Sequence, residues 1–250
     1  VNLDNNGRLW AGSAYDGYHD MVFSGGTINM IGTNGDSYIT GTVTENDGGN
    51  KLLFKGTTVN VLTDGRIDGY DIEIAGSTFN VNKDAELLFS ATYSTNEEKH
   101  GQSYEAAPLT LSSGAINNNQ GVIISDLAMT VSGGTLTTDK LGVGAPAEGG
   151  ATEADNGTFF AKKGITISGG TVTVGTINTS DSTSITLSGG TLQTGSSNVF
   201  TLAENAGALF SEDTTATFVK GNDEVTGIKT GLSLTSGTLA LTDEGYYTNS

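Results

Sequence analysis

One short pattern recurs along the whole chain: apolar, any residue, apolar, two or three small or polar residues, a small residue or Thr, and a further apolar residue. Five copies keep this pattern clearly, namely MVFSGGTINM (21–30), MTVSGGTLTT (129–138), ITISGGTVTV (165–174), ITLSGGTLQT (185–194) and LSLTSGTLAL (232–241). Three degenerate copies are LLFKGTTVNV (52–61), IEIAGSTFNV (72–81) and LTLSSGAINN (109–118). A unit this short cannot bury its own apolar face, so repeated units are expected to stack on one another.

The spacing of the copies supports a coil with a fixed turn length. The last apolar residue before the small residues marks each copy, at Phe23, Phe54, Ile74, Leu111, Val131, Ile167, Leu187 and Leu234. The steps between these markers are 31, 20, 37, 20, 36, 20 and 47 residues. Because a step of 20 residues recurs three times, we expect about one turn per 20 residues. Each longer step then holds either a poorly marked extra turn or a looped-out insertion.

Within each copy the apolar residues alternate, which is the period of a β-strand. Ile165 and Ile167 point one way, for example, with Thr166 between them. The paired glycines permit positive φ and close backbone approach, so the chain can turn a corner between two short strands without a long loop. The predicted structural corner glycines are Gly25, Gly26, Gly133, Gly134, Gly169, Gly170, Gly189 and Gly190.

Two β architectures use glycine turns of this kind. A meander of antiparallel hairpins would usually have Asn-Gly or Asp-Gly turns, and it would not require a 20-residue step. A coil of parallel strands does require one, because each turn must return to the same corner about 4.8 Å along the axis. The predicted fold class is therefore all-β: a right-handed parallel β-helix (β-solenoid) with turns of about 20 residues and projecting loops.

The predicted organisation has an N-terminal cap or connection over residues 1–20 and a parallel β-helix over residues 21–250. Loop insertions are predicted near 92–108 and 144–158, which are polar, rich in Gly or Ala, and similarly placed in two successive units. The first ten residues contain neither an initiator Met nor a signal-like apolar stretch. We therefore expect the chain to be a segment of a longer, processed precursor.

Charge and composition exclude several classes of function. The net charge is −17, spread along the chain, and such a surface repels nucleic acid and anionic membranes. The absence of Cys removes thiol catalysis, iron–sulfur clusters and Cys-ligated zinc. No apolar run is long enough for a membrane helix. We accordingly predict no cofactor, no nucleic-acid partner and no membrane insertion by this segment.

The densest group of candidate functional side chains lies in TDGRIDGYD (63–71). Asp64, Arg66, Asp68 and Asp71 could bind a ligand such as Ca²⁺ or act on a polysaccharide. The same residues could instead form Asp/Gly turns with a local ion pair. The two histidines are His19, in a polar aromatic stretch that could bind sugar or cover the end of the coil, and His100, in a polar loop. No catalytic, cofactor-binding or metal-binding residue is assigned.

The recurring Ser-Gly-Gly-Thr-apolar-any-apolar unit resembles the passenger regions of Gram-negative autotransporters and related haemagglutinin-type surface adhesins. It is matched at Ser24–Met30, Ser132–Thr138, Ser168–Val174 and Ser188–Thr194. The resemblance implies an extracellular or cell-surface location and a non-enzymatic structural or adhesive role, with surface glycans or proteins as partners.

Two alternatives remain open. One is a filament or surface-layer subunit that self-associates end to end through its terminal turns, because a terminal turn has unpaired backbone groups. The other is a carbohydrate-active β-helix enzyme that uses the acidic group of 63–71.

Overall fold

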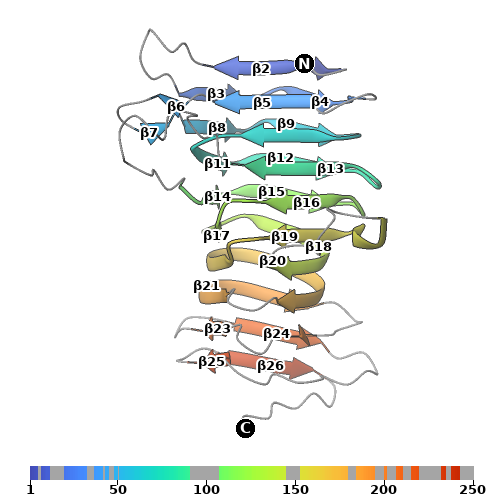
Figure 1. The fold of residues 1–250 in the computed structure, drawn as a ribbon. Helices are drawn as coiled ribbons and strands as arrows, with labels where there is room; N and C mark the ends of the chain where they lie inside the picture. The colour runs from blue at the N-terminus through green and yellow to red at the C-terminus, as the bar shows by residue number, and fades with distance from the viewer. Residues whose placement is uncertain are drawn as a thin grey trace, which may run out of the picture.

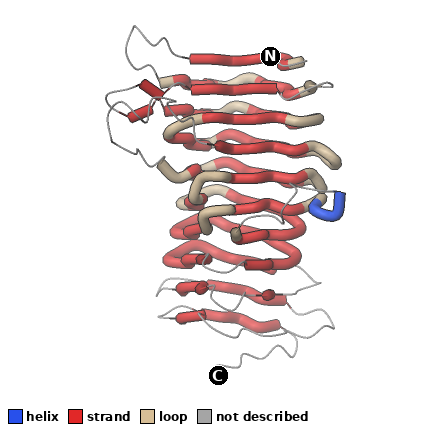
Figure 2. Tube along the Cα trace, in the orientation of Figure 1, coloured by secondary structure: helices blue, strands red, loops and turns tan. Residues whose placement is uncertain are grey.

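The computed structural model confirms the predicted parallel β-helix, with strands of successive turns side by side along one axis (Figures 1 and 2). It describes residues 1–4, 7–11, 20–32, 37–41, 43–44, 48–49, 51–90, 107–144, 153–179, 184–194, 200–201, 207–210, 215–219, 232–234 and 238–242. Its strands form three columns, called columns A, B and C below. Within these residues the only antiparallel contacts are the hairpin of β6 (Val43–Thr44) and β7 (Gly48–Gly49) and an isolated bridge between Gly32 and Asp64.

Column A contains the strands that carry the sequence markers. In order along the axis they are β3 (Met21–Ser24), β8 (Lys51–Lys55), β11 (Asp71–Ala75), β14 (Leu109–Leu111), β17 (Met129–Val131), the first parts of β20 (Ile165–Thr179) and β21 (Ser184–Thr194), β23 (Gly207–Phe210) and β25 (Leu232–Leu234). All eight markers lie in this column.

Column B follows column A after each corner. Its strands are β1 (Asn2–Leu3), β4 (Thr27–Met30), β9 (Thr58–Val61), β12 (Ser77–Val81), β15 (Gly114–Asn118), the first half of β18 (Thr135–Val143), the middle of β20, the second part of β21, β24 (Thr215–Val219) and β26 (Thr238–Thr242). The coil thus begins with β1, inside the range predicted for an N-terminal cap or connection.

Column C completes each turn. Its strands are β2 (Arg8–Ala11), β5 (Ser37–Gly41), β10 (Gly65–Asp68), β13 (Glu86–Ser90), β16 (Val122–Ser125), β19 (Thr158–Ala161), the second half of β18, the end of β20 and β22 (Phe200–Thr201). β19 follows β18 in the chain but lies between β16 and β18 in space. A 3₁₀ turn, η1 (Glu153–Asp155), lies in the connection. Column C therefore gains an extra strand where a simple projecting loop was predicted.

The irregular steps of the sequence now have distinct explanations. The steps of 20, 31, 36 and 37 residues each join direct neighbours in column A; Val131, for instance, pairs with Ile167. The extra residues of these longer steps lie in the connections between strands. The step of 47 residues instead contains an unmarked turn, because Phe210 pairs with both Leu187 and Leu234.

Inward-facing side chains of all three columns form one continuous apolar core. Phe54, Phe79 and Phe89 are completely buried within it. Phe23 and Phe54 stack with their ring centroids 4.7 Å apart, and Phe54 meets Phe79 edge to face at 5.1 Å. Stacking like residues on like follows from the parallel register, so the core extends with each added turn. No helix among the described residues is long and apolar enough to span a membrane.

The corners between columns A and B are of two kinds. In the first turns the second residue of the corner has positive φ, as at Gly56 and Gly76, and the third residue is a buried Thr57 or Ser77. The Thr57 hydroxyl donates to the carbonyl of Phe23 at 2.9 Å, and the Thr57 N–H donates to the Ser77 hydroxyl at 2.9 Å. These buried hydroxyls therefore tie successive corners together.

In later turns the third corner residue has positive φ instead, at Gly114, Gly134, Gly170 and Gly190. Gly133 and Gly169 precede two of these residues without positive φ, yet a Cβ on either would lie within 2.3 Å of the carbonyl oxygen of Ser112 or Ser132. Glycine is required at Gly133 and Gly169 because successive corners stack closely. Gly25 and Gly26 both have positive φ, and Gly189 lies in β21, opposite Ser168.

Candidate functional site

The N-terminal end of column A differs from the ends of columns B and C. β1 precedes β4 in column B, and β2 precedes β5 in column C. Within the described residues, β3 pairs with β8 alone, so one edge of β3 has no partner strand. Column A is thus one strand shorter than its neighbours at this end of the coil.

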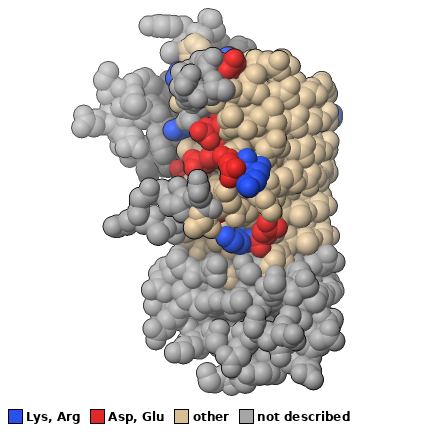
Figure 3. Space-filling model, turned by 90° about the vertical axis from the view of Figure 1, so that its right-hand side faces the viewer, with Lys and Arg blue, Asp and Glu red and all other residues tan. Residues whose placement is uncertain are grey.

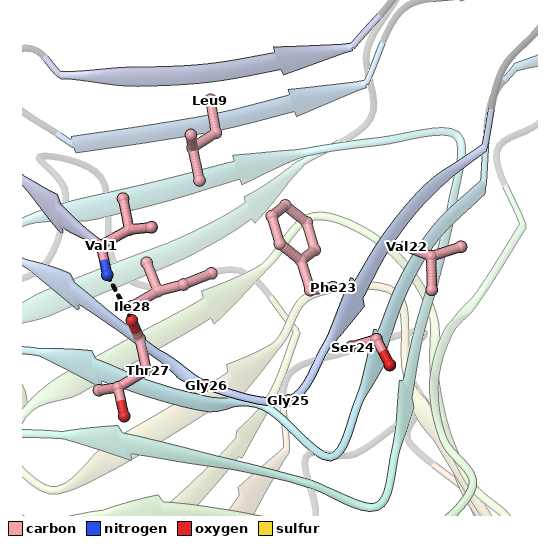
Figure 4. A pocket seen from close by; sticks show the side chains of 9 residues that line it. All are labelled: Val1, Leu9, Val22, Phe23, Ser24, Gly25, Gly26, Thr27 and Ile28. Carbon is pink, nitrogen blue, oxygen red and sulfur yellow. Dashed lines mark hydrogen bonds between the residues drawn. The ribbon is translucent and has the colours of Figure 1, made fainter.

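An open pocket of about 390 Å³ lies at this position (Figure 4). It is lined by Val1, Leu9, Val22, Phe23, Ser24, Gly25, Gly26, Thr27 and Ile28. We call it the N-terminal slot. Figure 4 shows the side chains of Leu9, Phe23 and Ile28 around the pocket, whereas Val22 and Ser24 point away from it. The Val1 amino group donates a hydrogen bond of 2.6 Å to the carbonyl oxygen of Thr27, which holds β1 over β4.

Large exposed apolar side chains gather around the N-terminal slot. Val1, Trp10 and Val22 are 66%, 65% and 52% exposed. The only other large apolar side chain exposed to this degree in the described part of the chain is Leu62, at 42%. A cluster of exposed apolar groups at one place on a soluble surface marks a candidate interaction site.

The four candidate ligand residues of 63–71 do not converge on one site. Arg66 and Asp68 lie in β10, where Arg66 Nε donates to Asp68 Oδ1 at 2.6 Å and Arg66 NH2 donates to the Ser90 hydroxyl at 3.2 Å. The Ser90 hydroxyl also donates to Asp68 Oδ1. This network joins two neighbouring turns of column C and leaves Asp68 only 9% exposed.

Asp64 and Asp71 belong to other parts of the coil. Asp64 Oδ1 accepts a hydrogen bond from the backbone N–H of Glu86 at 3.3 Å. Asp71 lies beyond the next corner, in column A, with an oxygen 3.7 Å from Lys51 Nζ. Within the described part of the chain, no three acidic or His side chains are grouped so that they could hold a metal ion. Each candidate carboxylate therefore has its own structural partner.

A second charged group lies on the outer side of column A, centred on Lys51. Lys51 Nζ is 2.5 Å from Glu73 Oε2, and Glu73 Oε1 also accepts a 2.7 Å hydrogen bond from the Ser112 hydroxyl. The hydrogen bonds from Lys51 and then Ser112 hold the pKa of the Glu73 carboxyl below its ordinary value. The hydrogen bond to Glu73 raises the pKa of Lys51 in turn. In the view of Figure 3 the charged side chains of the described residues gather in one strip, and a broad uncharged surface lies beside it.

Part of the uncharged surface is an asparagine ladder on the outer side of column B. Each amide Nδ2 in the ladder donates to the Oδ1 of the preceding turn, at distances of 2.8, 2.9, 3.0 and 3.0 Å. The members are Asn2, Asn29, Asn60, Asn80 and Asn117. The ladder ends where Thr137 takes the same register position. The recurring Thr-apolar-Asn of 27–29, 58–60 and 78–80 could have revealed it in the sequence.

The structure places the remaining sequence candidates outside the residues it describes. His19, His100 and most of the predicted loops at 92–108 and 144–158 belong to this group. No protein-family model matches the chain, and neither a curated protein nor a solved structure matches it.

Proposed function

We propose that this chain is a non-enzymatic structural and adhesive module of a bacterial cell surface, a rigid β-helical stalk that displays loops to surface glycans or proteins. The observation that carries the proposal is the continuous stack of parallel strands around one core. Such a stack is about 4.8 Å long per turn and stiff along its axis, because every turn is hydrogen-bonded to its neighbours on all three sides. The resemblance to autotransporter passengers, carried by the Ser-Gly-Gly-Thr units, supplies the location outside the cell.

The arrangement of charged residues supports a scaffold more than a carbohydrate-active enzyme. An enzyme of this fold would gather acidic residues from consecutive turns into one groove, with pKa values set apart for acid and base roles. Here Asp68 binds Arg66 and Ser90, Asp71 lies near Lys51, and Asp64 binds a backbone N–H. The outer positions of column B are filled instead by Asn and Thr.

The test is to display the chain on a non-adherent bacterium through an unrelated anchor and to count cells bound to host-cell monolayers and to glycan-coated surfaces. We expect adhesion to be gained, and to be lost when residues 92–106 are replaced by a Gly/Ser linker of equal length. The control for this variant is an unchanged circular dichroism spectrum. A chain that confers neither adhesion nor aggregation contradicts the proposal. Polysaccharide cleavage that Asp68→Asn abolishes would establish the enzyme alternative, and concentration-dependent fibres would establish the filament.

A further inference from the structure

We propose that the N-terminal slot is a strand-addition site, which binds one extended segment of a partner polypeptide parallel to β3. The segment has apolar side chains at two alternate positions, basic residues before them and small residues after them. This interaction is independent of the adhesive role proposed above, because it concerns the end of the coil and not its loops.

The first observation is the free edge of β3. Alternate backbone N–H and C=O groups of a strand point to opposite neighbours, and those of Met21–Ser24 have β8 as their only partner strand among the described residues. Every later strand of column A down to β23 has a partner on each side. A strand added before β3 would satisfy this edge, as in other cases of recognition by strand addition.

The second observation is the apolar surface beside that edge. Phe23 has one ring face against Phe54, at a centroid distance of 4.7 Å and an interplanar angle of 11°. Its other surroundings include the N-terminal slot, and Phe23 is only partly buried although Phe54 is completely buried. An apolar side chain placed before Phe23 would continue the stack and remove the ring from water.

The chemistry of the occupant follows from the other turns of column A. At each level two inward residues flank one outward residue, as in Leu52 and Phe54, Ile72 and Ile74, and Leu109 and Leu111, all completely buried. The occupant therefore needs apolar residues at two alternate positions, which would lie over Met21 and Phe23. Small residues must follow them, because the occupant would reach the corner above Gly25 and Gly26.

Charge selects the residues that precede this apolar pair. A strand parallel to β3 begins near Asp20, the residue before β3, and the whole chain carries a net charge of −17. A basic segment is therefore favoured over an acidic one, chiefly through faster association.

The N-terminal slot is one strand deep, which excludes an intact second copy stacked end to end. β25 and β26 lie at the same level of columns A and B, because they pair with β23 and β24 of the preceding turn. If β25 of one copy lay before β3 of another, β26 would occupy the level that β1 already occupies next to β4. A single extended segment meets no such obstacle.

The test uses the full chain and a peptide with the sequence KKGITISGG, which copies residues 162–170. Binding is measured by fluorescence anisotropy of the labelled peptide, and its place by amide hydrogen exchange of the unlabelled complex. We expect saturable binding with a Kd below about 1 mM, together with slower exchange at Met21–Ser24. The control peptide KKGNTNSGG replaces both inward Ile residues by Asn. It is expected to bind about 100-fold more weakly or not at all, because it buries no apolar side chain in the slot.

Two chain variants complete the test. Phe23→Ser removes the ring that the occupant covers and is expected to weaken peptide binding at least about tenfold. Trp10→Ala removes an exposed side chain that does not line the slot and should leave the affinity unchanged. Absence of binding by the wild-type chain up to about 1 mM, protection only at other strands, or equal binding of the two peptides would each overturn the proposal. The hydrogen-exchange result on the wild-type chain decides the matter even if Phe23→Ser does not fold.

Discussion

The same four residues, Ser-Gly-Gly-Thr, form a corner at the open end of the coil and another in its middle, and the two corners respond differently to added volume. At the open end, Gly26 has φ +78°, and a Cβ there would meet no atom within 4 Å. In the middle, Gly170 has φ +70°, and a Cβ there would lie 2.5 Å from the carbonyl oxygen of Gly134 and 2.6 Å from the carbonyl carbon of Gly133. One motif thus serves two physical requirements.

The difference shows how the repeat specifies the fold. Positive φ requires glycine at both corners, because a Cβ in that backbone conformation is strained. Only the inner corner also requires glycine for close approach, because the backbone of the preceding corner lies against it. The recurrence of the glycine pair along the chain therefore records the stacking of turns as well as their bending.

Replacement of the two glycines separates these requirements and has the largest expected effect. Gly26→Ala should lose about 1–2 kcal/mol of unfolding free energy from strain alone. Gly170→Ala should lose that amount and about 3 kcal/mol more from overpacking against backbone atoms that cannot rotate away. Urea denaturation followed by circular dichroism measures both variants. Equal losses would contradict the stacking requirement.

The aromatic stack offers a second comparison between the middle and the end. Phe79→Ala should cost about 3–5 kcal/mol, because a completely buried ring leaves a cavity. Phe23→Ala should cost about 1–2 kcal/mol, because the ring is only partly buried beside the N-terminal slot. The same denaturation measurement applies. A larger cost at Phe23 than at Phe79 would mean that the slot is closed in solution.

The asparagine ladder should show a smaller difference of the same kind. Asn80 both donates to Asn60 and accepts from Asn117, whereas Asn2 at the end only accepts from Asn29. Asn80→Ala is expected to lose about 1–2 kcal/mol and Asn2→Ala about 0.5 kcal/mol, from two partly exposed hydrogen bonds and one exposed bond. Thermal unfolding of the two variants side by side tests this order, and the reverse order would contradict it.

The Lys51–Glu73 pair should have the smallest effect, and the effect should depend on pH. The lowered pKa of Glu73 stabilises the fold at pH above the ordinary Glu value, and this gain is lost as pH falls through the folded-state value. The raised pKa of Lys51 stabilises the fold below the ordinary Lys value, and this gain is lost as pH rises through the folded-state value.

Lys51→Met should therefore lower the free energy of unfolding by less than about 1 kcal/mol near neutral pH, because the pair is partly exposed to solvent. The difference from the wild-type chain should shrink in both acid and alkali, as measured by urea titration across pH. The conservative variant Lys51→Arg keeps the charge and is expected to retain most of the effect. A loss for Lys51→Met that stays constant across pH would show that the Lys stem, and not its charge, stabilises the fold.

Much of the fold could be predicted because its information is local and repeated. The markers from Phe23 to Leu234 identified column A, and the alternation around them identified the inward face. The turn at Phe210 has no glycine pair, so its pattern was too weak to mark it. The candidate site was predicted less well, because closeness in sequence was taken for closeness in space. Asp68 and Asp71 are three residues apart, yet a corner places them in columns C and A.

The sequence by itself determined that the chain coils in parallel strands, which residues face inward, and where glycine must stand. Those properties depend on a residue and its neighbours within one turn. Only the tertiary structure decided the level of each strand, for instance that β19 lies between β16 and β18 although it follows β18 in the chain. It alone also left column A one strand short beside β1, because levels are set by hydrogen bonds between turns, which join residues far apart in the chain.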